Sequence, residues 1–342
     1  MFAQHAMYRN TSRVLLLAVG LFVLASAAWA QVQSLDAAHI SPRVDPAFTA
    51  SVTEGMPIPV LKPRPLRVDV NLVLVPVTVL DSFNRPVTDL PQQNFSLFEG
   101  GVPQKIQFFS REDAPMSVVL VLDFSGSMNN KIEYEREAVE QFFENANPED
   151  DYTVIAVSDR PNLVAESSRS SDAIESKLAS MEPKGTTSLF DSIYLGVAKL
   201  RMAGYKRRAM VIVSDGGDNH SRYNLKEIKH VLEESDVLTY SIGIFDDIPI
   251  PLIKTIEERM GRKWLDDVTS ATGGRNIAAD DRRKIPEIAA LISRELRTQY
   301  ILGYHPTDPN YDGKWRKITV KLTDTPAQMR AHFKAGYLAP GQ

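Results

Sequence analysis

The chain has 342 residues, a formal net charge of −4, and ordinary contents of hydrophobic (43%) and charged (24%) residues. This composition is typical of a globular protein, and the length allows one domain of about 200 residues beside a smaller one. The acidic balance, without a Lys/Arg stripe, argues against a nucleic-acid-binding protein. The absence of cysteine excludes disulfides and a lipid-modified cysteine.

The first 30 residues have the pattern of an export signal. Arg9 and Arg13 precede an apolar run from 14 to 28, and Ala28-Trp29-Ala30 offers a cleavage site between small residues. The apolar run is shorter than a typical transmembrane helix. We therefore expect residues 1–30 to be a signal peptide cleaved after Ala30. The mature protein is then expected to be secreted or held in the periplasm or cell envelope, with no stable membrane insertion.

A proline-rich segment and a group of short strands come next. Residues 31–65 contain repeated prolines and little hydrophobic periodicity, which is typical of a linker. Apolar residues stand at the even positions over 68–74 and at the odd positions over 75–79, the alternation typical of a strand. Because the pattern shifts by one residue beside Pro76, this proline is expected at a bulge or sheet edge. Further strands are expected at 95–99 and 105–109. We therefore interpret 66–112 as one half of a β-domain.

From residue 117 the pattern changes to strands alternating with amphipathic helices. This alternation predicts an α/β fold over 113–298, with a doubly wound, mostly parallel sheet and right-handed crossovers. A capping box, Ser188-x-x-Asp191, is expected to begin the helix over 188–203. The expected strands are 118–122, 152–157, 209–213 and 238–244, and the other expected helices are 132–143, 172–181, 225–232 and 282–298.

The pattern returns to strands after residue 298. Residues 300–304, 315–322 and 329–337 each read as extended. Neither this group nor the earlier one has enough strands to bury both faces of a sandwich. We therefore expect 66–112 and 299–338 to form one small β-sandwich, into which the α/β domain is inserted.

The most informative feature is an apolar strand that ends in three oxygen-bearing side chains, Asp123, Ser125 and Ser127. A second apolar strand ends at Asp215, and Thr187 lies in the loop before the helix from 188. The carboxyl ends of parallel strands meet at one edge of a sheet, so these groups can converge. Carboxylate and hydroxyl oxygens suit a hydrated divalent cation such as Mg²⁺ better than zinc or copper. The sequence therefore predicts a metal site at this edge.

In this order the residues resemble the metal-ion-dependent adhesion site of von Willebrand factor type A domains. Asp123-Phe-Ser125-Gly-Ser127 is similar to the first segment of that site, and Ser-Asp215-Gly is similar to its last. Thr187 fits the Gly-Thr-x-Leu-x-Asp pattern of the family better than Thr186 does. Flanking strand segments extend the resemblance over 66–338, toward bacterial, acidobacterial-type von Willebrand factor A-related proteins.

The resemblance implies a binding module for adhesion or assembly, and not an enzyme. Ser125, Ser127 and Thr187 would supply hydroxyl ligands, directly or through water. Asp123 and Asp215 would act largely through hydrogen-bonded waters. One coordination position would stay open for an Asp or Glu carboxylate of a protein or peptide partner. The expected cation is Mg²⁺, with Mn²⁺ and Ca²⁺ as alternatives, and no nucleic acid is expected as a partner.

Other functions stay open at this point. A metal-dependent hydrolase, such as a phosphatase with Asp123 as nucleophile, would normally need a second carboxylate two positions on, where this chain has Ser125. A structural cation that only ties loops together would need no partner. Asp218 and Asn219 are expected to be solvated loop residues. The loop 245–251 is either a plain connection or a determinant of partner choice.

Overall fold

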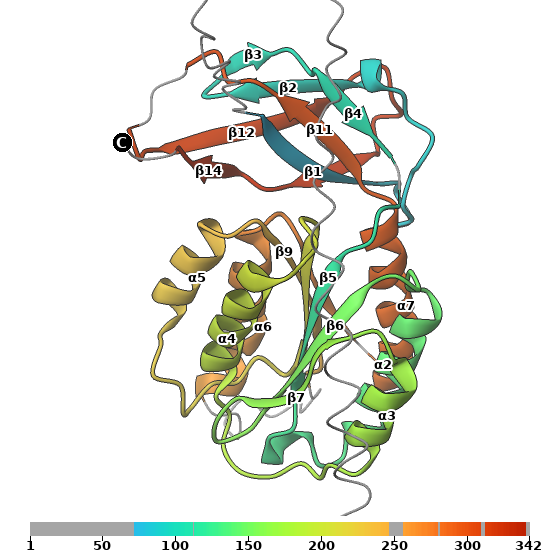
Figure 1. Cartoon of the computed structure of the whole chain (residues 1–342), viewed down its shortest axis with the longest axis vertical. Helices are drawn as coiled ribbons and strands as arrows, with labels where there is room; N and C mark the ends of the chain where they lie inside the picture. Colours follow the sequence, from blue (N-terminus) through green and yellow to red (C-terminus); the bar gives the residue numbers. More distant parts are fainter. Residues whose placement is uncertain (1–71, 112, 246–255, 280, 309–311, 340–342) are drawn as a thin grey trace, which may run out of the picture. The chain divides into compact units, whose positions relative to one another are not determined.

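The computed structural model of the chain describes residues 72–111, 113–245, 256–279, 281–308 and 312–339 (Figure 1). The predicted signal and linker, and most of the loop 245–251, lie outside these residues. The described elements form one six-stranded sheet covered by helices and two four-stranded sheets. Within the described ranges, every helix is too short or too polar to cross a membrane.

The six-stranded sheet has the order β10-β9-β8-β5-β6-β7. Its strands are parallel except β7, which pairs antiparallel with β6 at one edge. β5 is buried along its whole length, as expected for a parallel strand covered on both faces. The strands are β5 (Ser117–Asp123), β6 (Asp151–Val157), β7 (Asn162–Ser168), β8 (Arg208–Ser214), β9 (Val237–Gly243) and β10 (Asn276–Ala278).

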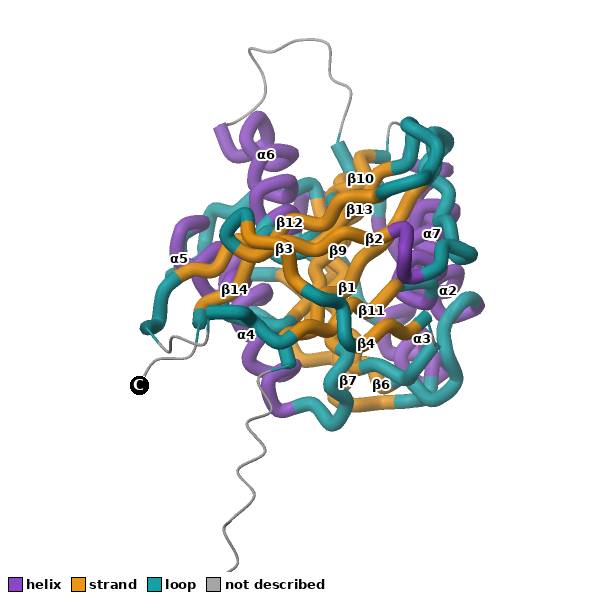
Figure 2. Tube along the Cα trace, turned by 90° about the horizontal axis from the view of Figure 1, so that it is seen from above, coloured by secondary structure: helices purple, strands orange, loops and turns teal. Residues whose placement is uncertain are grey.

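Successive residues of β5 point to opposite faces of the sheet, and each face has its own core. Val118, Leu120 and Leu122 pack with α2, α3 and α7. Val119 and Val121 pack with α4, α5 and α6. Figures 1 and 2 show the two groups of helices on opposite sides of the strands, which confirms the predicted doubly wound arrangement. The helices are α2 (Ile132–Glu144), α3 (Ser171–Ala179), α4 (Leu189–Met202), α5 (Leu225–Glu233), α6 (Ile256–Ser270) and α7 (Ile285–Arg297).

The predicted capping box at the start of α4 is wrong. Ser188 is the N-cap residue, but its hydroxyl donates to the carbonyl of Ser158 at 2.7 Å and does not cap the helix. The Asp191 carboxylate instead accepts hydrogen bonds from the backbone N–H groups of Arg222 and Tyr223. Both side chains are buried between loops, so contacts distant in sequence replace the local cap.

The two four-stranded sheets make the predicted β-sandwich. One sheet has the order β13-β1-β11-β4 and the other the order β14-β12-β2-β3, so each contains strands from both sides of the α/β domain. Apolar residues of both sheets, among them Val77, Leu97, Leu302 and Val320, form a common core. The strands are β1 (Val73–Leu80), β2 (Phe95–Glu99), β3 (Val102–Gln104), β4 (Phe108–Ser110), β11 (Tyr300–Tyr304), β12 (Trp315–Leu322), β13 (Arg330–Phe333) and β14 (Gly336–Leu338).

Two details of the sandwich differ from or refine the sequence prediction. Residues 329–337, predicted as one strand, form parts of β13 and β14, which belong to different sheets. Pro76 lies within β1 and does not end it. β1 pairs with β13 only from Val77 onward, so on that side Pro76 is at a sheet edge, where a residue without an N–H is tolerated. β4 leads into the α/β domain and β11 leads out of it, and these two strands pair antiparallel, with Phe109 opposite Leu302.

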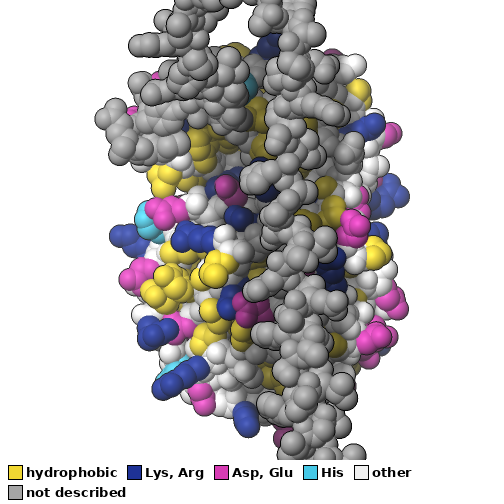
Figure 3. All heavy atoms as spheres, viewed as in Figure 1, with side chains coloured by type: hydrophobic (Ala, Val, Ile, Leu, Met, Phe, Trp, Pro, Cys, Tyr) yellow, Lys and Arg dark blue, Asp and Glu magenta, His cyan; other side chains and the backbone are white. Residues whose placement is uncertain are grey.

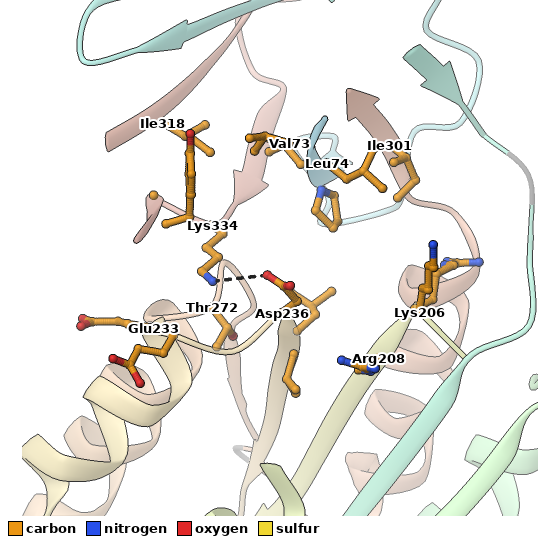
Figure 4. Close-up of a pocket in the computed structure, with 18 of the residues that line it drawn as sticks. Val73, Leu74, Lys206, Arg208, Glu233, Asp236, Thr272, Ile301, Ile318 and Lys334 are labelled. Atoms are coloured by element: carbon orange, nitrogen blue, oxygen red, sulfur yellow. Dashed lines mark ion pairs between the residues drawn. The ribbon is translucent and has the colours of Figure 1, made fainter. Parts of the chain in front are cut away.

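A cavity of about 1130 Å³ lies at the amino ends of β8 and β9 (Figure 4). Leu74 of β1 and Ile301 of β11 line it on one side, and charged side chains such as Arg208 and Asp236 line it on another. Nζ of Lys334 lies 4.0 Å from Oδ1 of Asp236 at its margin. The cavity is therefore at the opposite edge of the sheet from the carboxyl ends of the strands, where the candidate metal ligands lie.

Candidate metal centre

Asp123 is the last residue of β5 and is fully buried. Its Oδ1 accepts a hydrogen bond from the backbone N–H of Ser125 at 3.0 Å, and its Oδ2 accepts one from Oγ of Ser214 at 2.6 Å. Ser214 ends β8, the neighbouring strand. The structure therefore joins the two strand ends that carry the first and last segments of the candidate site.

The hydroxyl groups of Ser125 and Ser127 lie side by side, with their Oγ atoms 3.1 Å apart. Ser125 is buried, whereas Ser127 is exposed in the short turn Gly126–Met128. The backbone N–H of Gly126 donates to the carbonyl of Gly185 at 3.1 Å, which binds this turn to the loop that carries Thr187. A Cβ at Gly126 would lie 3.2 Å from that carbonyl, so glycine permits the close approach of the two loops.

Thr187 lies just before α4 and is 6% exposed. Its backbone N–H donates to Oδ1 of Asn219 at 2.9 Å, and its carbonyl accepts hydrogen bonds from the backbone N–H groups of Asn219 and His220. The backbone N–H of Phe190 donates to Oδ2 of Asp218 at 2.9 Å. Asp218 is half-buried and Asn219 is exposed, as expected for loop residues, but both also bond the loop after β8 to the Thr187 segment.

Asp215 follows β8 and faces a buried lysine. Its Oδ1 accepts a hydrogen bond from the backbone N–H of Gly217 at 3.0 Å, and its Oδ2 lies 3.9 Å from Nζ of Lys131. Gly216 has a φ of +79°, and a Cβ there would lie 2.4 Å from the carbonyl oxygen of Gly261. The turn that presents Asp215 therefore requires glycine at the next position.

A third acid lies beside Asp123. Glu135 on α2 is 1% exposed, and its Oε1 accepts a hydrogen bond from the backbone N–H of Asp123 at 2.8 Å. Its Oε2 has no hydrogen-bond partner among the residues that the structure describes. Burial, and next the charge of Asp123, hold the pKa of Glu135 well above its ordinary value. The site therefore contains more buried acid than the sequence predicted.

Neither Lys131 nor Glu135 was singled out in the sequence, although a signal was available. Glu135 stands three, four and seven residues before Ala138, Val139 and Phe142, which form the buried stripe of α2. A charged residue within an apolar helical stripe is buried only when it has a partner or a function. The same stripe, continued back by one turn, reaches Lys131.

The electrostatics of the site favour a bound cation. Burial, and next the negative charge of Asp215, raise the pKa of Asp123 to about 6, while the hydrogen bonds from Ser125 and Ser214 act in the opposite direction. Two ionised carboxylates in a buried site repel each other and lose hydration, unless positive charge compensates them. The arrangement therefore stabilises positive charge at the carboxyl edge of the sheet.

The donor set fits a hard divalent cation. Hydrogen bonds link Asp123, Ser125, Ser127 and the end of β8 into one cluster, and the Thr187 loop is bonded to the segments on both sides of it. Across the described ranges, no group of three or more His, Cys, Asp or Glu side chains is placed to hold a metal. A metal here would therefore depend on hydroxyl oxygens, which Mg²⁺, Mn²⁺ and Ca²⁺ accept together with carboxylates and water.

The chain resembles several solved structures at low sequence identity. No curated protein matches the chain. Similar solved structures include the hypothetical protein BatB from Bacteroides thetaiotaomicron, at 16% identity and a TM-score of 0.42, covering 53% of this chain and 98% of that one. Another is von Willebrand factor type A from Catenulispora acidiphila, at 12% and 0.46, covering 79% and 62%. A third is proximal thread matrix protein 1 from the mussel byssus with a zinc-occupied metal-ion-dependent adhesion site, at 13% and 0.43, covering 58% and 49%.

The decisive comparison is with a family model. Residues 118–217, which run from β5 to the turn after β8, match the model of the von Willebrand factor type A domain. This segment contains all five candidate ligands and four strands of the central sheet. Residues 118–217 therefore belong to a von Willebrand factor type A domain.

Proposed function

We propose that the chain is a metal-dependent protein-interaction module that holds a divalent cation, preferably Mg²⁺, and through it captures a carboxylate of a protein or peptide partner. The observation that carries this proposal is the buried cluster in which Asp123 is bonded to both Ser125 and Ser214 at the carboxyl edge of the sheet. The family match supports it, because such domains commonly mediate protein–protein interactions.

In this proposal the five residues divide into two roles. Ser125, Ser127 and Thr187 supply neutral hydroxyl oxygens, while Asp123 and Asp215 supply negative charge through hydrogen-bonded water. A cation with few direct carboxylate ligands remains electron-poor, and Mg²⁺ keeps exchangeable waters. A partner carboxylate that replaces one water gains Coulomb attraction in a site partly shielded from solvent. Binding to acidic groups is therefore favoured over binding to neutral ones.

We propose binding in preference to catalysis at this site. A nucleophilic aspartate must reach its substrate, but Asp123 is fully buried and both of its carboxylate oxygens accept hydrogen bonds. Assays with Mg²⁺ and a panel of phosphate esters test the alternative. Turnover that disappears in Asp123→Ala would favour a hydrolase, and we expect no turnover.

The proposed setting is adhesion or assembly outside the cytoplasm. The described part of the face shown in Figure 3 carries basic and acidic side chains interspersed, a pattern that does not suit an extended phosphate backbone. Sequencing the amino terminus of the mature protein tests export, since cleavage after Ala30 is expected. An uncleaved protein retained in the cytoplasm would contradict this part of the proposal.

Calorimetric titration with Mg²⁺ tests the proposed site. Thr187→Ala removes a proposed ligand and should weaken Mg²⁺ binding about tenfold or more, the loss expected when a ligand is missing. Thr186→Ala is the matched control, because Thr186 is exposed and its Oγ1 donates to Oδ1 of Asp159 at 2.7 Å. Equal weakening in both variants, or no Mg²⁺ binding by the native protein, would contradict the proposal.

A second titration separates a binding site from a structural cation. Sodium acetate serves as the carboxylate probe, with sodium chloride at equal ionic strength as the control. Acetate that tightens Mg²⁺ binding of the native protein would support capture of acidic groups. If Mg²⁺ binds and acetate has no effect at any concentration, the cation only ties the loops together.

A further inference from the structure

Lys131 places a buried positive charge beside the candidate metal centre. The residue is 2% exposed, and its Nζ lies 3.9 Å from Oδ2 of Asp215. A lysine side chain is rarely buried to this extent, and an ammonium group is tolerated inside a protein only where negative charge compensates it. The position of Lys131 therefore depends on the acids of the site.

The local backbone makes this position still less favourable for a cation. Lys131 is the N-cap residue of α2, and the amino end of a helix carries partial positive charge that attracts anions and repels cations. Glu133 and Glu135 in the first turn follow the usual preference. The Asp215 carboxylate therefore helps to stabilise the ammonium group, whereas the helix that Lys131 precedes does not.

The acids around Lys131 belong to one electrostatic cluster. Asp215 faces the ammonium group directly, and Asp123 is held by Ser214, the residue before Asp215. Glu135 lies one helical turn after Lys131, and its carboxyl accepts a hydrogen bond from the backbone N–H of Asp123. Lys131 and a divalent cation at the proposed site would therefore draw on the same negative charge.

We propose that Lys131 is an intrinsic competitor of the divalent cation, which lowers the affinity for the metal alone and makes metal binding depend on the carboxylate of the partner. This inference rests on the function proposed above. With Asp123 and Asp215 ionised, the ammonium group offsets part of the negative charge that would attract the incoming metal. A partner carboxylate adds a second negative charge and offsets the repulsion between the metal and Lys131.

Metal and partner then bind cooperatively, and the coupling is reciprocal. A site without the ammonium group would fill according to the concentration of the metal. A site with it fills mainly when an acidic partner is present. The buried lysine therefore converts a metal site into a sensor of the partner.

The test is calorimetric titration of Mg²⁺ into the full chain and three variants. Lys131→Met keeps the length of the side chain and removes its charge, and it should bind Mg²⁺ at least about tenfold more tightly. A unit charge within several ångströms of the metal changes its affinity by more than tenfold at an effective dielectric constant of about 20. Lys131→Arg keeps the charge and should therefore not bind Mg²⁺ more tightly than the native protein does. Lys184→Met is the matched control, because Lys184 is exposed although its backbone N–H donates to the carbonyl of Phe124 at 2.8 Å.

The coupling is measured by repeating the titrations in sodium acetate and in sodium chloride of equal ionic strength. Acetate should tighten Mg²⁺ binding by a larger factor in the native protein than in Lys131→Met. An equal factor in both proteins would overturn the cooperative part of the inference.

The remaining outcomes separate this inference from the proposed function. If Mg²⁺ binds to all variants with the native affinity, or more weakly to Lys131→Met, the role of Lys131 is overturned and the proposed metal site stands. If Mg²⁺ binds to none of them, both are overturned. Should Lys131→Met be unstable without metal, the rise in Tm on adding Mg²⁺ is compared instead. It should exceed the rise in the native protein, and an equal or smaller rise contradicts the inference.

Discussion

Replacing Glu135 by glutamine is expected to stabilise the metal-free protein at neutral and alkaline pH. In the native protein the Glu135 carboxyl is 1% exposed and accepts the Asp123 N–H through Oε1. Its Oε2 has no hydrogen-bond partner in the part of the chain that the structure describes. Glutamine keeps an acceptor for Asp123 and cannot ionise, so it removes the cost of a buried acid without removing the hydrogen bond.

The size and the pH dependence of the gain follow from the site. Each unit by which the folded pKa of a carboxyl is raised costs about 1.4 kcal/mol at high pH, so Glu135→Gln should raise the free energy of unfolding by about 1–3 kcal/mol at pH 8. The folded pKa of Glu135 is raised above its ordinary value of 4.5, so the folded protein binds the proton more tightly than the unfolded chain does. Native stability is therefore lost as the pH rises through the folded pKa, and the advantage of glutamine should shrink toward zero near pH 4.5.

Urea denaturation in EDTA at pH 5 and pH 8 measures this difference. Glu133→Gln is the control, because Glu133 lies in the same helical turn and its side chain is 75% exposed. The control should change stability little at either pH. If Glu135→Gln is less stable than the native protein at pH 8, or if its effect is the same at both pH values, then the raised pKa of Glu135 does not lower native stability and the reasoning fails.

Three other perturbations have defined outcomes. Ser214→Ala leaves Oδ2 of Asp123 without its 2.6 Å donor and should lower the free energy of unfolding by about 1.5–3 kcal/mol in urea denaturation, so an unchanged midpoint would contradict the assigned bond. Mg²⁺ affinity measured by calorimetry should be constant above about pH 7 and fall below about pH 6. Burial and the charge of Asp215 raise the pKa of Asp123 to about 6, so protons compete with the metal at lower pH, and a flat profile down to pH 5 would refute this. Arg275→Met removes the guanidinium partner of the fully buried Glu295 and should lower the free energy of unfolding by about 3–5 kcal/mol. The double variant with Glu295→Gln should recover most of that loss, and a loss below about 1 kcal/mol in Arg275→Met would count against a buried ion pair.

The fold was largely predictable because its signals are local. The run from 118 to 122 is apolar at every position, and both faces of β5 are buried, so the run itself indicates a parallel strand under two layers of helices. β7 was missed because Ala165 is its one buried residue, which leaves no periodicity to detect. The division of 329–337 between two sheets was missed because pairing with distant strands, not local propensity, decides where β13 ends and β14 begins.

The sequence predicted where the candidate ligands lie along the chain, but not the charged groups that tertiary packing adds around them. Asp123, Ser125 and Ser127 are two apart along the chain, and their spacing alone indicated a polar turn after a strand. The contacts of Lys131 with Asp215, and of Glu135 with the backbone of Asp123, span segments that only tertiary packing brings together. In the sequence, these two residues look like an ordinary charged pair on the first turn of a helix.

The pairing of β4 with β11 has a mechanical consequence. These are the strands by which the chain enters and leaves the α/β domain, and they are held to each other by backbone hydrogen bonds, with Ser110 opposite Ile301. A force that pulls apart the chain segments before β4 and after β11 therefore acts first on the sandwich. It reaches the loops around Asp123 only after the backbone hydrogen bonds between β4 and β11 have broken.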